Sequence, residues 1–129
     1  MKNIFRKISN FVSTVRAHRA EPLRLEFILS DYCNLNCKGC THYSPLAPRV
    51  FEPIEQLERN AAHLGAAVGK GLGSAYLIGG ETLLYPHLPE AMDILRKNFP
   101  DTRILLFTNG ILLPKMAPEF WEAARRNKV

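Results

Sequence analysis

The sequence has little cysteine and no long apolar run, and both shortages remove classes of protein from consideration. Its 129 residues include three cysteines within eight positions, which is too close a spacing for the disulfides that hold small secreted domains together. No secretory signal precedes them. No apolar run approaches the roughly 20 residues that a membrane-spanning helix requires. We therefore expect a protein of the reducing cytoplasm that does not span a membrane.

Acidic residues are absent from positions 1–20, where five basic residues give the whole formal net charge of +5. Positions 21–129 hold 12 basic and 12 acidic residues, so they lack the basic groove of a nucleic-acid-binding domain, and we expect no nucleic-acid partner. Apolar residues at helical spacing over positions 3–17 predict a basic amphipathic helix in residues 1–20. Packing of this helix on the domain or on a partner is the favoured interpretation, and peripheral membrane contact through residues 3–17 is the alternative.

The rest of the chain alternates between two hydrophobic patterns. Apolar runs predict strands near residues 24–30, 74–78 and 102–107. The run over 74–78 is of the kind that is buried on both faces of a parallel sheet. Apolar positions three and four apart predict helices near 53–69, 88–98 and 118–126. Two prolines in residues 44–48 disfavour a helix and predict an extended segment there. Alternation of strands and helices predicts an α/β fold built from right-handed βαβ units around a parallel sheet.

A cysteine motif follows the first predicted strand. Cys33, Cys37 and Cys40 form a C-x-x-x-C-x-x-C pattern, and thiolates prefer iron-sulfur clusters, zinc or Cu(I) over hard cations. A four-iron cluster held by three cysteines leaves one iron open to a small-molecule ligand. The competing interpretation is a zinc site completed by His42, although structural zinc sites usually use two separated pairs of ligands.

Two further motifs follow the second and third predicted strands. The turn Gly79–Glu81 combines two glycines, which allow close backbone approach, with a carboxylate. The turn Thr108–Gly110 contains Asn-Gly, a common turn former in any protein. Because the carboxyl ends of parallel strands meet at one edge, we expect both turns to lie beside the cysteine loop. The three motifs in this order resemble the radical S-adenosylmethionine (radical SAM) superfamily, over Leu23 to Val129.

The resemblance implies an enzyme with a [4Fe-4S] cluster on Cys33, Cys37 and Cys40. The open iron would bind S-adenosyl-L-methionine (SAM), whose reductive cleavage gives a 5′-deoxyadenosyl radical that abstracts hydrogen from a substrate that the sequence does not identify. Flavodoxin or ferredoxin would donate the electron. The cofactor-binding residues would be Gly79, Gly80, Glu81, Thr108 and Asn109.

The resemblance also implies roles for single positions. The turn Gly79–Glu81 would lie along the methionine part of SAM, with the Glu81 carboxylate complementing its amino group. Thr82 stands where the family often has proline, and Gly39 stands where it commonly has an aromatic residue near adenine. The candidates for contact with adenine are then Tyr32, His42 and Tyr43.

The family core is normally a partial (β/α) barrel of six units, of which residues 21–129 would supply about three, as a truncated amino-terminal half. The edge strand would then be unpaired, and Phe107, Leu112 and Trp121 would have few partners. We therefore expect the chain alone to associate and to show little activity. A zinc-binding interaction module and an inactive remnant are the other interpretations that the sequence leaves open.

Overall fold

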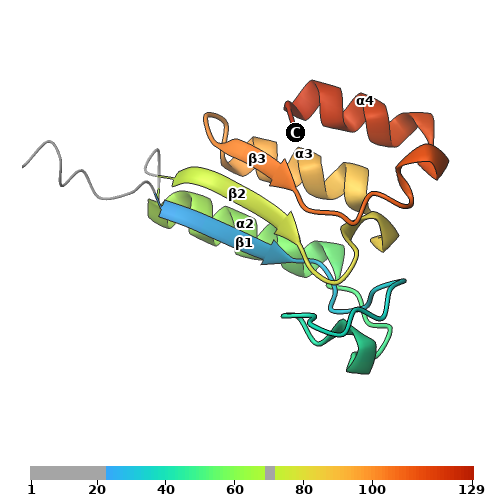
Figure 1. Cartoon of the computed structure of the whole chain (residues 1–129). Helices are drawn as coiled ribbons and strands as arrows, with labels where there is room; N and C mark the ends of the chain where they lie inside the picture. The colour runs from blue at the N-terminus through green and yellow to red at the C-terminus, as the bar shows by residue number, and fades with distance from the viewer. Residues whose placement is uncertain (1–22, 69–71) are drawn as a thin grey trace, which may run out of the picture.

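The computed structural model describes residues 23–68 and 72–129, in which strands and helices alternate along the chain (Figure 1). The elements in chain order are β1 (Leu23–Ile28), α2 (Ile54–Val68), β2 (Leu72–Ile78), α3 (Leu88–Asn98), β3 (Arg103–Leu106) and α4 (Pro118–Asn127). The strands form one parallel sheet in the order β1-β2-β3. The predicted α/β fold of three βα units is confirmed for these ranges. The helix predicted in residues 1–20 lies outside the described residues.

Three local predictions differ from the structure. The first strand ends at Ile28 instead of residue 30, because Ser30 leaves the ladder with β2 and forms an antiparallel bridge with Phe51. The second strand begins earlier than predicted, since Leu72 pairs with Leu23. Ser44–Leu46 is a one-turn 3-10 helix and not an extended segment. Pro45 is tolerated in it because the first turn of a helix does not need that N–H.

The helices α2 and α3 cover one face of the sheet, as Figure 1 shows. On this face Phe27 of β1 pairs in register with Leu77 of β2, and both side chains are buried. The centroids of the Phe27 ring and of the Phe99 ring, at the end of α3, lie 5.8 Å apart. Each side chain of this size contributes about 1.5–3 kcal/mol when fully buried. Along β2, buried Leu77 alternates with half-buried Tyr76 and Ile78. The prediction that residues 74–78 are buried on both faces is therefore wrong for the described part of the chain.

Apolar side chains remain exposed near the β3 edge. Phe107 and Trp121 each expose 45% of their surface, as the sequence led us to expect. Leu112 differs from that expectation, because it is partly buried against the hydrophobic core. None of the helices in the described ranges is long and apolar enough to cross a bilayer.

The end of the sheet opposite the motifs is held by one arginine. The Arg96 guanidinium of α3 donates hydrogen bonds to the carbonyl oxygens of Pro100 (2.8 Å), Thr102 (2.9 Å) and Asn127 (3.0 Å). These bonds tie the segment between α3 and β3 to the last residue of α4, whose carbonyl oxygen the helix end would otherwise leave open. This end of the molecule is thus occupied by structural contacts, and the candidate site lies at the other end.

A loop of about 20 residues leaves the carboxyl end of β1, where Figure 1 shows it projecting beyond the sheet. Its base is closed by the Ser30 hydroxyl, which donates to the Val50 carbonyl oxygen over 2.6 Å. The Tyr85 hydroxyl donates to the Glu52 carbonyl oxygen over 2.8 Å, and burial raises the pKa of Tyr85 to about 12, so this donor stays protonated. The loop that carries the cysteines is therefore anchored at both of its ends.

Candidate functional site

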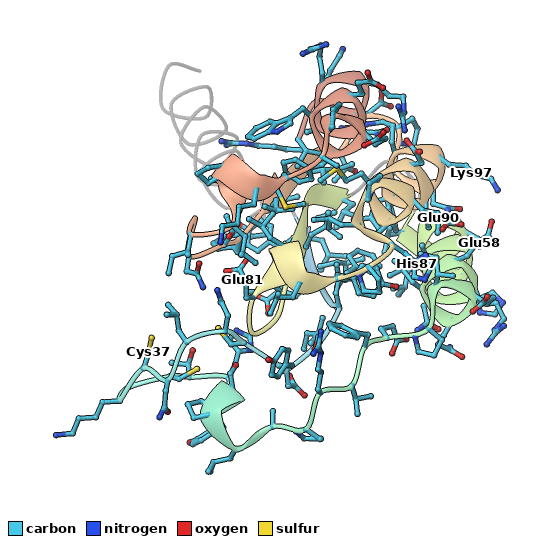
Figure 2. All side chains as sticks on the ribbon, turned by 90° about the vertical axis from the view of Figure 1, so that its right-hand side faces the viewer. Cys37, Glu58, Glu81, His87, Glu90 and Lys97 are labelled. Carbon is cyan, nitrogen blue, oxygen red and sulfur yellow. The ribbon has the colours of Figure 1, made fainter. Side chains whose placement is uncertain are left out.

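The three motifs meet at the carboxyl edge of the sheet. Figure 2 shows Glu81 beyond the end of β2 and Cys37 on the projecting loop, on the same side of the molecule. Cys33 and Cys40 are half-buried and Cys37 is exposed. The Cys40 N–H donates to the Cys37 carbonyl oxygen (3.3 Å), which turns the loop between these two cysteines. Topology alone thus brings residues from three βα units to one place, as predicted.

The cysteines differ in the groups that surround their sulfur atoms. The Cys33 Sγ accepts a hydrogen bond from the Leu35 N–H over 3.4 Å. The backbone N–H of Ser44 lowers the pKa of the Cys40 thiol, with smaller contributions in the same direction from the Ser44 hydroxyl and the backbone of His42 and Tyr43. The Ser44 Oγ itself is buried and has no hydrogen-bond partner within the described ranges. N–H groups directed at sulfur favour the thiolate, which is the form that binds metal.

This donor set fits an iron-sulfur cluster. It offers three thiols on one anchored loop, one with a lowered pKa, next to a buried hydroxyl without a partner. Within residues 23–68 and 72–129, no three His, Cys, Asp or Glu side chains lie close enough to share one metal ion. A cluster binds each thiolate through a separate iron, whereas a zinc site would need the thiolates and His42 around one ion, so the two interpretations differ in whether they need His42.

Gly79 and Gly80 bring the turn after β2 against the start of the cysteine loop. The Gly80 N–H donates to the Ser30 carbonyl oxygen (2.7 Å), and the next N–H, of Glu81, donates to that of Tyr32 (3.0 Å). A Cβ on Gly79 would overlap the Ser30 carbonyl oxygen, and a Cβ on Gly80 would overlap that of Tyr32. The glycines are thus required by contact with the protein's own backbone.

Gly80→Ala is expected to destabilise the metal-free chain by about 1–3 kcal/mol, the usual range for overpacking, because the clash is with backbone that cannot move aside. Urea unfolding measures this change. Gly39→Ala is the matched control, since its Cβ would have no neighbour within 4 Å. Equal stability of the two variants would show that the turn and the loop do not need to be in contact.

The Glu81 side chain links the turns after β2 and β3. It is 1% exposed, and its Oε1 accepts hydrogen bonds from the Leu83 N–H (2.8 Å) and the Thr108 hydroxyl (2.6 Å). Its Oε2 accepts from the Asn109 N–H (2.8 Å). The sequence predicted that this carboxylate complements the amino group of a ligand, but in the structure its oxygens are engaged within the protein. The carbonyl oxygens of Gly79 and Gly80 accept no backbone hydrogen bond from the described chain, so they are the free acceptors of this turn.

The turn after β3 reaches the cysteine loop through Asn109. Its Nδ2 donates to the Asn34 Oδ1 over 2.9 Å and lies 3.9 Å from the Cys33 Sγ, while its Oδ1 accepts from the Ile111 N–H over 3.0 Å. Thr108 closes the turn by accepting from the Gly110 N–H over 3.0 Å. Sequence reasoning missed Asn34, because its partner lies 75 positions away and nothing local marks the pair.

The candidates for contact with adenine have different surroundings. The Tyr32 ring makes an edge contact with Phe51 at 6.5 Å, and the Arg49 guanidinium lies 5.3 Å from its centre. Tyr43 is 73% exposed and, with Leu46, lines an open hollow of about 500 Å³ beside the cysteines. His42 is half-buried. Of these rings Tyr43 has the most free surface, and the choice among the three stays a prediction.

Comparison with known proteins identifies relatives of this chain. The family model described as the radical SAM superfamily matches residues 27–128. The GTP 3′,8-cyclase of Paenarthrobacter nicotinovorans is 33% identical over 102 residues, which are 78% of this chain and 28% of the cyclase. That of Alkaliphilus oremlandii is 30% identical over 95 residues, 74% of this chain and 30% of the cyclase. The chain thus spans less than a third of these relatives.

A solved structure has the same fold. It is the crystal structure of BtrN in an open conformation, which superposes with a TM-score of 0.56 at 19% identity and covers 81% of this chain and 45% of BtrN. At this identity the likeness concerns the arrangement of strands and helices alone.

Proposed function

Because the chain belongs to the radical SAM superfamily, we propose that its cysteine loop holds a [4Fe-4S] cluster and that the adjoining edge of the sheet binds SAM. Members of this superfamily use both groups. When bound, the cluster supplies the electron that cleaves the sulfonium of SAM into methionine and a 5′-deoxyadenosyl radical, which abstracts hydrogen from a substrate. The observation that supports the proposal most is the hydrogen-bonded contact of all three motif turns at one edge.

Each part of the edge has a task in this proposal. Cys33, Cys37 and Cys40 would hold the cluster, and with three protein thiolates one iron would stay available to SAM. The free carbonyl oxygens of Gly79 and Gly80 accept hydrogen bonds from the SAM amino group, because carbonyl oxygens suit an ammonium donor. Three residues act through position: Glu81, Thr108 and Asn109 hold the two turns together around the cofactor.

An electron donor is the partner that this chemistry requires. We propose a small redox protein, such as flavodoxin or ferredoxin, because reductive cleavage consumes one electron for each SAM. Cys37 is exposed on the projecting loop, so a cluster bound there lies near the protein surface. A reducing compartment such as the cytoplasm keeps these thiols free of disulfides.

Addition of SAM to the anaerobically reconstituted and reduced chain is expected to change the EPR spectrum of the cluster, since a new ligand enters at the open iron. Reduction in the presence of SAM is expected to give only a little 5′-deoxyadenosine, detected by chromatography, in line with the low activity that the sequence predicts for this chain alone. S-adenosylhomocysteine has no sulfonium to cleave and is the control that should give none. An unchanged spectrum at saturating SAM, in a chain that contains four irons, would contradict the cofactor site.

A further inference from the structure

We propose that Asn34 and Asn109 form a latch that positions the cysteine loop, and that the Asn109 amide donates a second hydrogen bond to the Cys33 sulfur. The latch is the side-chain hydrogen bond of 2.9 Å from the Asn109 Nδ2 to the Asn34 Oδ1. Both asparagines are positioning residues. The inference about the loop concerns the metal-free chain, and the inference about the sulfur rests on the proposed cluster site.

The middle of the cysteine loop has few ties to the rest of the molecule. Its base is anchored up to Tyr32, whose carbonyl oxygen accepts from the Glu81 N–H over 3.0 Å. Within residues 33–43, the other hydrogen bonds of the described chain stay inside the loop, such as those from Leu35 N–H to Cys33 Sγ and from Tyr43 N–H to the Cys40 carbonyl oxygen. The Asn109 side chain is thus the hydrogen-bonded link between this segment and the sheet.

The direction of the Asn109 amide is fixed by its other partner. The Ile111 N–H can only donate, so the group that it contacts at 3.0 Å must be the Asn109 oxygen. The NH₂ group then faces the cysteine loop. It carries two hydrogens, of which one serves Asn34, and the nitrogen lies 3.9 Å from the Cys33 Sγ, within hydrogen-bond reach of that sulfur. Asn109 itself is held by the buried Glu81 carboxylate through its backbone N–H.

This arrangement has consequences for loop order and for electron transfer. Without the latch, residues 33–43 keep only their internal hydrogen bonds and should open more often. Hydrogen bonds to cluster sulfurs are one of the features that set reduction potentials, because they stabilise the more negative reduced state. Loss of the Asn109 donor should therefore lower the midpoint potential of the reconstituted chain.

Hydrogen exchange in the metal-free chain tests the latch. Asn109→Ala and Asn34→Ala are each expected to speed amide exchange in residues 33–43 by about fivefold, the factor that corresponds to one hydrogen bond of about 1 kcal/mol. The double variant should be no faster than Asn109→Ala, since Asn34→Ala removes a bond that Asn109→Ala has already removed. Asn36→Ala is the matched control in the same loop, because Asn36 is exposed and makes no hydrogen bond within the described chain. Exchange unchanged by Asn109→Ala would overturn the latch whether or not the chain binds a cluster.

The potential tests the bond to sulfur separately. Asn109→Asp keeps an oxygen for the Ile111 N–H but has no NH₂, and Asn34→Ala removes the latch but keeps the NH₂ next to Cys33. The midpoint potential should fall in Asn109→Asp and in Asn109→Ala, and should fall less in Asn34→Ala. Equal potentials in the wild type and Asn109→Ala would overturn the donor role. Failure of the wild type to bind iron would refute the proposed function and the donor role together. The exchange experiment would still decide whether the latch exists, because it uses the metal-free chain.

Discussion

Replacing Cys33, Cys37 and Cys40 together by alanine is expected to abolish the iron and sulfide that the wild-type chain takes up on anaerobic reconstitution. The wild type should hold about four irons and four sulfides, since three thiolates with this spacing suit one four-iron cluster. Each single replacement should also lose the cluster, because two thiolates on an exposed loop leave half of the irons without protein ligands. Iron and sulfide analysis, with the brown absorbance of the cluster, measures the loss.

A His42→Ala variant distinguishes the proposed cluster from a zinc site completed by His42, the other interpretation that the sequence leaves open. It should retain its iron and sulfide, since the proposed cluster needs no imidazole ligand. Stoichiometric zinc that is lost in His42→Ala, in a colourless and air-stable wild type, would support the zinc-binding module instead. Retention of the same iron and sulfide by the triple alanine variant would show that the metal binds elsewhere.

The sequence predicted those parts of the site that depend on local pattern. The helix α3 has the predicted bounds, because its apolar face and the following Pro100 are both visible within a few residues. The meeting of the cysteine loop with the turns after β2 and β3 followed from parallel topology, which places the ends of successive strands at one edge. Both inferences use features that lie within one βα unit or repeat from unit to unit.

The parts that the sequence did not predict depend on pairs of distant residues. The bond between Asn34 and Asn109 joins the segments that follow β1 and β3, and no local pattern specifies this pair. The bridge between Ser30 and Phe51 shortens β1 for a similar reason. The glycines of the turn after β2 are a further case, since the sequence indicated close approach but could not show that the approaching group is the protein's own loop.

Glu81 shows how a motif residue can act on a ligand indirectly. The motif predicts that the Glu81 carboxylate faces the SAM amino group. In that case Glu81→Ala would remove one charged hydrogen bond and weaken SAM binding by about 1.5–3 kcal/mol. The structure instead buries the carboxylate between two turns, where it accepts three hydrogen bonds. These two roles predict different results for the same substitution, because only the second one changes the stability of the ligand-free chain.

Glu81→Ala is therefore expected to lower the free energy of unfolding of the metal-free chain by about 4 kcal/mol, since it leaves three donors unpaired next to a cavity. Glu81→Gln should lose less, about 1.5–3 kcal/mol, because its oxygen still serves the Leu83 N–H and the Thr108 hydroxyl while its NH₂ opposes the Asn109 N–H. Urea unfolding measures both.

Glu122→Ala, on the exposed side of α4, is the matched control and should change the unfolding free energy by less than about 0.5 kcal/mol. The loss of unfolding free energy in Thr108→Val should lie between those of the control and of Glu81→Ala, since this variant removes one of the three hydrogen bonds to the carboxylate. A Glu81→Ala chain as stable as the wild type that no longer binds SAM would assign the carboxylate to the cofactor. A destabilised Glu81→Ala chain that still binds SAM with unchanged affinity when folded would show that the carboxylate holds together the turns after β2 and β3 and does not contact the cofactor.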